Sequence, residues 1–245
     1  MSDLLRVDDV HVAFGGTKAV DGVTLGIPEG EITGLIGPNG AGKTTLFNVV
    51  TGMQRPTSGR VFLDDHDVTR MSPAKRAHRG VARTFQRLEL FMTLSVRDNV
   101  RVAGDIVNAN RRERIDIDGD TDRLLELTGL ASVAHLDVSD IPTGLARVVE
   151  VARALMTRPK VLLLDEPASG QTESETEIFA SALEELTRTT GLTICLVEHD
   201  LPLVMRLCST IHVLDRGRLI ASGTPAEVRS SPEVIAAYIG DEDVA

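Results

Sequence analysis

The sequence predicts an α/β fold built around a largely parallel sheet. A strand-like apolar run over 31–36 leads into a glycine-rich loop, and a helix is expected directly after it over about 43–51. A second helix is expected over about 173–190, between apolar runs of strand length. Strands in this second part are expected over 161–164, 193–198 and 211–214. Strands that alternate with helices favour parallel pairing, because each crossover packs a helix on the sheet.

The rest of the chain adds a β-rich start and a helical insertion. Strands are expected over 5–14, 23–27 and 60–63. From 72 to about 130 the strand signals fade and Arg-rich, helix-compatible sequence follows, with an acidic turn over 116–122. Thr224 and Ser231 mark two closing helices, since each is followed by Pro and shortly by Glu. Without a repeat or linker, we expect one domain over 1–245, with a helical subdomain over about 87–155.

Composition excludes several classes of protein. The 245 residues carry 26 Lys and Arg against 36 Asp and Glu, a net charge of −10, which disfavours nucleic acid as the main partner. The apolar runs fall far short of the roughly 20 residues that span a bilayer. The acidic N-terminus does not resemble a secretory signal, so we expect a cytoplasmic protein. The two cysteines form no disulfide framework and no metal-ligand pattern.

The loop over 37–44 has the spacing of a phosphate-binding loop, with Gly, four residues, Gly, Lys and Thr between a strand and a helix. Glycines let backbone N–H groups approach phosphate oxygens, and the helix N-terminus favours anions. A lysine at this place reaches the β- and γ-phosphates, and the hydroxyl after it ligates Mg²⁺. The alternative is a glycine turn followed by a surface lysine. The predicted nucleotide-binding residues are Gly37, Pro38, Asn39, Gly40, Ala41, Gly42, Lys43, Thr44 and Thr45.

Two adjacent acids, Asp165 and Glu166, follow the apolar run over 161–164. Asp165 is expected to hold Mg²⁺ directly or through water, while Glu166 faces the γ-phosphate and polarises the attacking water. One acid at the end of an apolar strand is common in α/β proteins. The second acid and the phosphate loop together predict an enzyme that hydrolyses a nucleotide.

From Phe14 to the C-terminus the sequence resembles the nucleotide-binding subunit of ABC transporters. The resemblance implies a P-loop ATPase cassette with an N-terminal antiparallel β subdomain and a helical insertion. It also implies that Gln86 contacts Mg²⁺ or its water, that His199 contacts the γ-phosphate and that Phe14 stacks on adenine. The alternatives are ordinary hydrogen-bonded polar residues for Gln86 and His199, and a core position for Phe14.

Within that family, the phrases over 14–16, 80–86, 197–200 and 222–240 look like the LivG-type subunit of branched-chain amino acid importers. The resemblance implies ATP and Mg²⁺, a second ATPase subunit and two membrane permeases. It also implies an extracytoplasmic solute-binding protein as an indirect partner, and a place on the cytoplasmic face of the membrane. Relatives with the same motifs serve urea, amides or other small polar solutes. Because the solute never touches this subunit, the sequence does not identify it. The sequence also does not say whether the partner ATPase is identical to this chain.

The signature loop of the family, which clamps the ATP of the opposite subunit, aligns with residues 141–147. Of its core motif only Gly144 is retained, while Leu145 replaces a polar residue. Thr172 stands where the family carries Asp or Asn. We therefore expect a complete ATP site on this chain and an impaired or asymmetric site in the partner that receives its signature loop.

Two other functions stay open at this point. One is a non-transport or regulatory ABC ATPase with impaired hydrolysis, and the other is the ATPase subunit of a lipid-type exporter. Basic residues bear on the choice: eleven lie between 70 and 114 against four acids. This stretch surrounds Gln86, which favours a basic docking side toward membrane partners, and an ordinary solvated Arg-rich face is the alternative.

Overall fold

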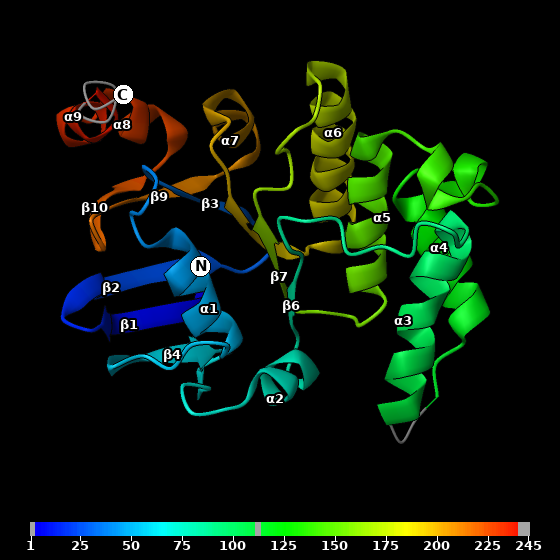
Figure 1. Cartoon of the computed structure of the whole chain (residues 1–245), viewed down its shortest axis with the longest axis horizontal. Coiled ribbons are helices and arrows are strands. Elements are labelled where there is room, and N and C mark those ends of the chain that lie inside the picture. The colour runs from blue at the N-terminus through cyan, green and yellow to red at the C-terminus, as the bar shows by residue number, and fades with distance from the viewer. Residues whose placement is uncertain (1–2, 111–113, 240–245) are drawn as a thin grey trace.

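The computed structural model describes residues 3–110 and 114–239, which form two sheets with helices packed around them (Figure 1). The first sheet is antiparallel, in the order β2–β1–β4–β5. The second has the order β10–β9–β3–β8–β7–β6 and is parallel except for the pairing of β9 with β10. The predicted fold class, a mostly parallel core with an antiparallel β part and a helical insertion, is confirmed.

The element bounds are as follows. The strands are β1 Asp3–Phe14, β2 Thr17–Pro28, β3 Ile32–Ile36, β4 Ser58–Leu63, β5 His66–Asp67, β6 Val81–Arg83, β7 Val161–Asp165, β8 Thr193–Val197, β9 Thr210–Asp215 and β10 Arg218–Gly223. The helices are α1 Lys43–Thr51, α2 Pro73–His78, α3 Val96–Asn110, α4 Ile117–Leu127, α5 Thr143–Leu155, α6 Glu173–Thr190, α7 Leu201–Leu207, α8 Pro225–Ser230 and α9 Pro232–Ile239.

The six-stranded sheet separates two apolar cores. Along β7, Leu162 and Leu164 face the core shared with α3, α5 and α6, while Val161 and Leu163 face the core shared with α1 and the antiparallel sheet. This alternation follows from the two-residue repeat of a strand. Because both faces are covered, all five residues of β7 are buried, which explains the unbroken apolar run over 161–164.

Local signals fix the ends of the predicted helices. Thr172 and Glu175 form a reciprocal capping box at the start of α6, and Gly191 ends the helix in the left-handed conformation. Thr224 and Glu227 form a second capping box at α8, with Pro225 at the first position. The helices predicted over 43–51 and 173–190 have the same bounds in the structure.

The structure departs from the sequence prediction at several elements. The stretch from 72 to 130 contains strand β6, whose three residues are too few to show a periodicity but pair with β7. The acidic segment over 116–122 is the start of α4 rather than a turn. Asp116 caps this helix through the N–H of Gly119, and acids are favoured in a first helical turn. Strands β5 and β10 were also not predicted.

Within the basic stretch from 70 to 114, Arg111 and Arg112 lie outside the described residues, and the described basic residues do not form one continuous face. Arg76 is buried and donates to carbonyl oxygens of Val49, Val50 and Thr69, so it is unavailable for docking. Two more arginines of the stretch, at 97 and 101, pair with aspartates of α4. The excess of positive charge is therefore partly buried, at Arg76, and partly paired with acids at the surface, at Arg97 and Arg101. None of the helices in the described ranges is long and apolar enough to cross a membrane.

Candidate nucleotide-binding and catalytic site

The phosphate loop lies between β3 and α1, where two of its positions admit only glycine. Gly37 has a φ of 147°, and a Cβ there would lie 2.0 Å from the carbonyl oxygen of Leu214. Gly42 has a φ of 105°, and a Cβ there would lie 2.4 Å from the carbonyl oxygen of Ala19. Both positions combine a backbone region that favours glycine with a close approach of neighbouring backbone. The backbone of the loop therefore packs closely against the backbones of β9 and β2.

Lys43 is buried at the start of α1, and its ammonium folds back over the loop. It donates to the carbonyl oxygens of Gly37 at 2.6 Å and Pro38 at 3.0 Å. Burial lowers the pKa of Lys43, and the negative charges of Glu166 and Asp165 oppose this shift. The predicted lysine and the two predicted acids therefore lie within electrostatic reach of one another. Thr44 and Thr45 occupy the first turn of α1.

Glu166 is the point at which three predicted residues meet. Gln86 Nε2 donates to its Oε2 at 2.6 Å, and His199 Nε2 lies 2.9 Å from its Oε1. The backbone of Glu166 is held at a φ of 48° while its N–H donates to the carbonyl oxygen of Val197 at 2.8 Å. A non-glycine residue in this conformation is strained by about 1–3 kcal/mol, and such strain concentrates at functional sites. The arrangement fixes both oxygens of one carboxylate.

Asp165, the last residue of β7, is buried beside Glu166 and receives an ion pair from Arg83 at 2.6 Å. The predicted metal ligands are its carboxylate, the Thr44 hydroxyl and the Gln86 amide oxygen. Mg²⁺ prefers such oxygen donors and is held through one or two carboxylates plus substrate phosphates. No group of three or more His, Cys, Asp or Glu that could bind a metal occurs within 3–110 and 114–239. The oxygen donors of Asp165, Thr44 and Gln86 are of the kind that holds Mg²⁺ together with substrate phosphates.

Other predicted residues have the following places. Phe14, at the end of β1, is 52% exposed, so it is a surface aromatic and the core reading is wrong. Gly144 lies in the first turn of α5 against α6, where a Cβ would be 2.7 Å from the Cβ of Glu175. Its N–H donates to Glu175 Oε1 at 3.3 Å. Thr172 caps α6, which gives this departure from the family a structural role.

Glu198 is a buried acid that the sequence analysis did not single out. Its Oε1 accepts from the N–H of Ala168 at 2.6 Å, and its Oε2 accepts from the N–H of His199 at 3.0 Å. Burial raises the pKa of Glu198, although these backbone hydrogen bonds partly oppose the rise. It ties the loop after β7 to the loop after β8. Its place directly before His199 was the only signal in the sequence.

A second group found only in the structure holds the segment around Gln86. Arg147 of α5 donates to the carbonyl oxygens of Phe85 at 3.2 Å and Gln86 at 2.5 Å. It also pairs with Glu150 at 2.8 Å, and Glu150 accepts from the N–H of Glu89. Both charged side chains are almost fully buried. Helix α5 therefore anchors the backbone that presents Gln86 to Glu166.

The C-terminal helix α9 borders the phosphate loop. Burial raises the pKa of Tyr238 to about 12, and a hydrogen bond with the backbone of Gly37 acts in the opposite direction. A hollow of about 590 Å³ lies between this helix and the loop. Its lining includes Pro38, Asn39, Gly40 and Ala41 from the loop, and Glu233, Ala236 and Ala237 from α9. The hollow is not lined by Lys43, Asp165 or Glu166, so it lies beside the part of the site that these three residues form.

Comparison with known proteins agrees with this geometry. The ABC transporter family model matches residues 20–169, and the model described as branched-chain amino acid ATP-binding cassette transporter matches residues 218–244. The chain is 37% identical to the high-affinity branched-chain amino acid transport ATP-binding protein BraF of Pseudomonas aeruginosa and 38% identical to LivG of Escherichia coli. Each match covers 97% of this chain and 98% of the relative.

A solved structure, described as the ADP conformation of an ATP-binding cassette of an ABC transporter, superposes with a TM-score of 0.85 at 30% identity. The match covers 98% of this chain and 100% of the other. The family matches, the near-complete overlap with these relatives and the shared cassette fold lead to one assignment. The chain belongs to the ATP-binding subunits of ABC transporters, alongside the LivG and BraF proteins.

Proposed function

We propose that this chain binds and hydrolyses ATP to drive an importer of branched-chain amino acids or a related small polar solute. The position of Glu166 carries the proposal, since Gln86 and His199 hold its two oxygens within electrostatic reach of Lys43. A carboxylate fixed in this way is suited to accept a proton from the attacking water. The names of BraF and LivG, both branched-chain amino acid transport ATP-binding proteins, support the class of solute.

In this proposal ATP lies along the phosphate loop with its adenine on Phe14. Lys43 exchanges the carbonyl oxygens of Gly37 and Pro38 for phosphate oxygens, because an ammonium pairs better with an anion than with neutral acceptors. Thr44, Asp165 and Gln86 would hold Mg²⁺, and the ion would supply positive charge to neutralise the β- and γ-phosphates. His199 donates toward the γ-phosphate, and Glu166 orients and deprotonates the water.

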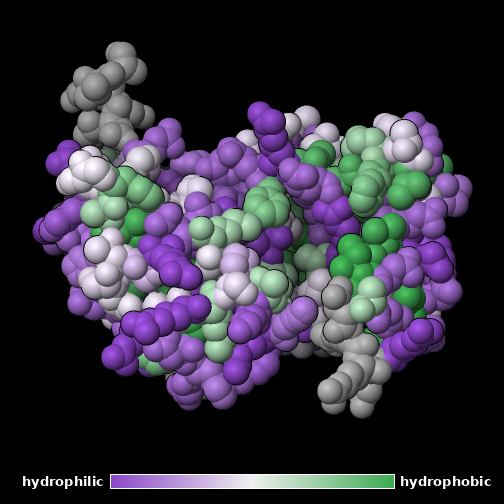
Figure 2. Space-filling view, turned by 60° about the horizontal axis from the view of Figure 1, so that its bottom comes forward, coloured by the Kyte–Doolittle hydropathy of each residue, from purple (hydrophilic) through white to green (hydrophobic). Residues whose placement is uncertain are grey.

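The partners we propose are a second ATPase subunit, two membrane permeases and, through these, an extracytoplasmic solute-binding protein. We place the chain, one ATPase domain over 1–245, on the cytoplasmic face of the membrane. Its helical subdomain over about 87–155 faces the permeases. Figure 2 shows hydrophobic patches concentrated toward the right-hand end of a largely hydrophilic surface, the end that the helices α3 to α5 occupy in Figure 1. Exposed apolar residues in this part include Phe91, Met92 and Ile106.

Uptake of radiolabelled leucine by cells tests this proposal. In the native strain, the wild-type chain is replaced by the Lys43→Ala variant. We expect leucine uptake to fall to that of a strain from which the chain is deleted, because the ATP phosphates lose their main cation. The matched control is Lys75→Ala, which removes an exposed lysine of α2 and should retain uptake. Isolation of the tagged wild-type chain without any permease, together with normal uptake in the deletion strain, would favour the regulatory function instead.

The signature loop gives a second prediction in the assembled transporter. Leu145 is half-buried and packs against the apolar core around α5, so this position offers no polar group to a nucleotide. For Leu145→Gln we expect ATP turnover to rise by roughly 2- to 10-fold, less than the factor of about 10²–10³ that a well-placed donor contributes in a complete site. Leu145→Met keeps an apolar side chain and should leave turnover unchanged. No rise with Leu145→Gln in a folded complex would count against an impaired partner site.

A further inference from the structure

Arg83 is a buried cation at the metal end of the site to which no role has been given so far. It ends strand β6, which pairs with β7, the strand that ends in Asp165. Its Nη2 donates to Asp165 Oδ2 at 2.6 Å, and the two side chains are only 7% and 9% exposed. The ion pair therefore takes one oxygen of the carboxylate proposed to hold Mg²⁺.

The guanidinium is held on its other sides by three further groups. Its Nη1 donates to Asn48 Oδ1 of α1 at 2.6 Å. Its Cζ lies 5.7 Å from the ring centroid of Phe47 and 5.2 Å from that of Phe85, distances at which a cation is attracted to an aromatic face. Arg83 thus joins the helix after the phosphate loop, the segment that leads to Gln86, and the strand of the acidic pair.

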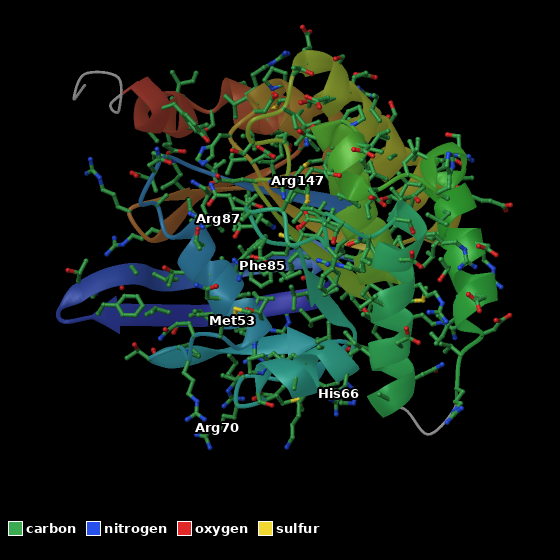
Figure 3. The ribbon with its side chains drawn as sticks, turned by 45° about the vertical axis from the view of Figure 1, so that its right-hand side comes forward. Met53, His66, Arg70, Phe85, Arg87 and Arg147 are labelled. Atoms are coloured by element: carbon green, nitrogen blue, oxygen red, sulfur yellow. The ribbon has the colours of Figure 1, made fainter. Side chains whose placement is uncertain are left out.

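Two of the groups around Arg83 reach the molecular surface. Phe85 is 40% exposed and Met53 is 54% exposed. The sulfur of Met53 lies 3.9 Å from Arg83 Nη1. Phe85 and Met53 are labelled in Figure 3. The Nε of Arg83 is buried without a hydrogen-bond partner among the described residues. This N–H is therefore available for a new hydrogen bond if the neighbours of the guanidinium move.

We propose that Arg83 is a positioning residue that fixes Asp165 and limits how tightly the site binds Mg²⁺ with its nucleotide. The inference rests on the proposed function. The positive charge of Arg83 balances the buried carboxylate, and it also repels a cation that approaches the same group. A partner that contacts Phe85 and Met53 at the surface would also affect Arg83, which touches both residues. Through the side chain of Arg83, this part of the surface is linked to Asp165, the proposed metal ligand.

The test is the Mg²⁺ dependence of nucleotide binding by the full chain, measured with a fluorescent ATP analogue, together with ATP turnover. For Arg83→Gln we expect the half-saturating Mg²⁺ concentration to fall by about threefold or more, because a nearby positive charge is lost. We expect turnover to fall as well, because Asp165 is no longer fixed. Arg83→Lys keeps the charge but not the planar fork, so it should keep the wild-type Mg²⁺ dependence with reduced turnover.

Arg87→Gln is the matched control, since Arg87 is an exposed arginine four residues along the chain and should leave both readouts unchanged. The proposal is overturned if the half-saturating Mg²⁺ concentration of folded Arg83→Gln is unchanged or higher than that of the wild type. It is also overturned if Arg83→Lys lowers this concentration as much as Arg83→Gln does. If circular dichroism shows that Arg83→Gln does not fold, Arg83→Lys decides alone: a wild-type Mg²⁺ dependence with reduced turnover supports the proposal, and a shifted Mg²⁺ dependence or an unchanged turnover overturns it. Failure of the wild-type chain to bind the analogue with Mg²⁺ would instead refute the proposed function, and this inference with it.

Discussion

Replacement of Glu166 by Gln is expected to lower ATP turnover by about 10²–10⁴-fold, the contribution of a positioned general base. Gln has the shape of Glu but does not accept a proton at neutral pH. ATP binding should persist, because the phosphate loop and Lys43 are untouched. The measurement is steady-state phosphate release alongside equilibrium binding of a fluorescent ATP analogue in the presence of Mg²⁺.

The matched control is Glu173→Gln, which changes an exposed acid in the first turn of α6 in the same way. It should retain wild-type turnover. Full turnover by a folded Glu166→Gln chain would remove Glu166 from the role of base. His199, 2.9 Å from Glu166, would then be the remaining candidate to activate the water.

Replacement of Arg147 by Met is expected to lower the free energy of unfolding by about 3–5 kcal/mol, because the buried carboxylate of Glu150 loses its partner. The carbonyl oxygens of Phe85 and Gln86 lose a donor in the same step. The segment that presents Gln86 to Glu166 should therefore loosen. Chemical denaturation measures the first effect, and turnover at a temperature where the variant is folded measures the second.

A surface ion pair provides the control for this prediction. Arg188 pairs with Glu185, but both side chains are well exposed, so Arg188→Met should cost less than about 1 kcal/mol. The double variant Arg147→Met with Glu150→Leu should recover part of the lost stability, since it no longer buries an unpaired charge. Equal losses for the two single arginine variants would contradict a special role of the buried pair.

Much of the site was predictable because its parts are local. The phosphate loop has a strand before it and a helix after it, so spacing alone predicted the Lys43 and Thr44 positions. Asp165 and Glu166 were predictable because a fully buried strand reads as an unbroken apolar run. The caps at Thr172 and Thr224 explain why the following helices begin where they do. Strand β6 was not predicted because three residues are too few to show the alternation of a strand, and β6 is recognised only by its pairing with β7.

The sequence by itself determined the fold class, the phosphate loop, the acidic pair and the family, since each depends on residues that are close in the chain. Only the tertiary structure decided which charged and polar groups pair with one another. Arg83 meets Asp165 across 82 positions, and Gln86 and His199 reach Glu166 from two other segments. Arg76, which looked like part of a basic surface, is buried beneath carbonyl oxygens of α1. The physical reason is that a charge count along the chain cannot tell a solvated arginine from one whose carboxylate or carbonyl partner arrives only when the sheet is assembled.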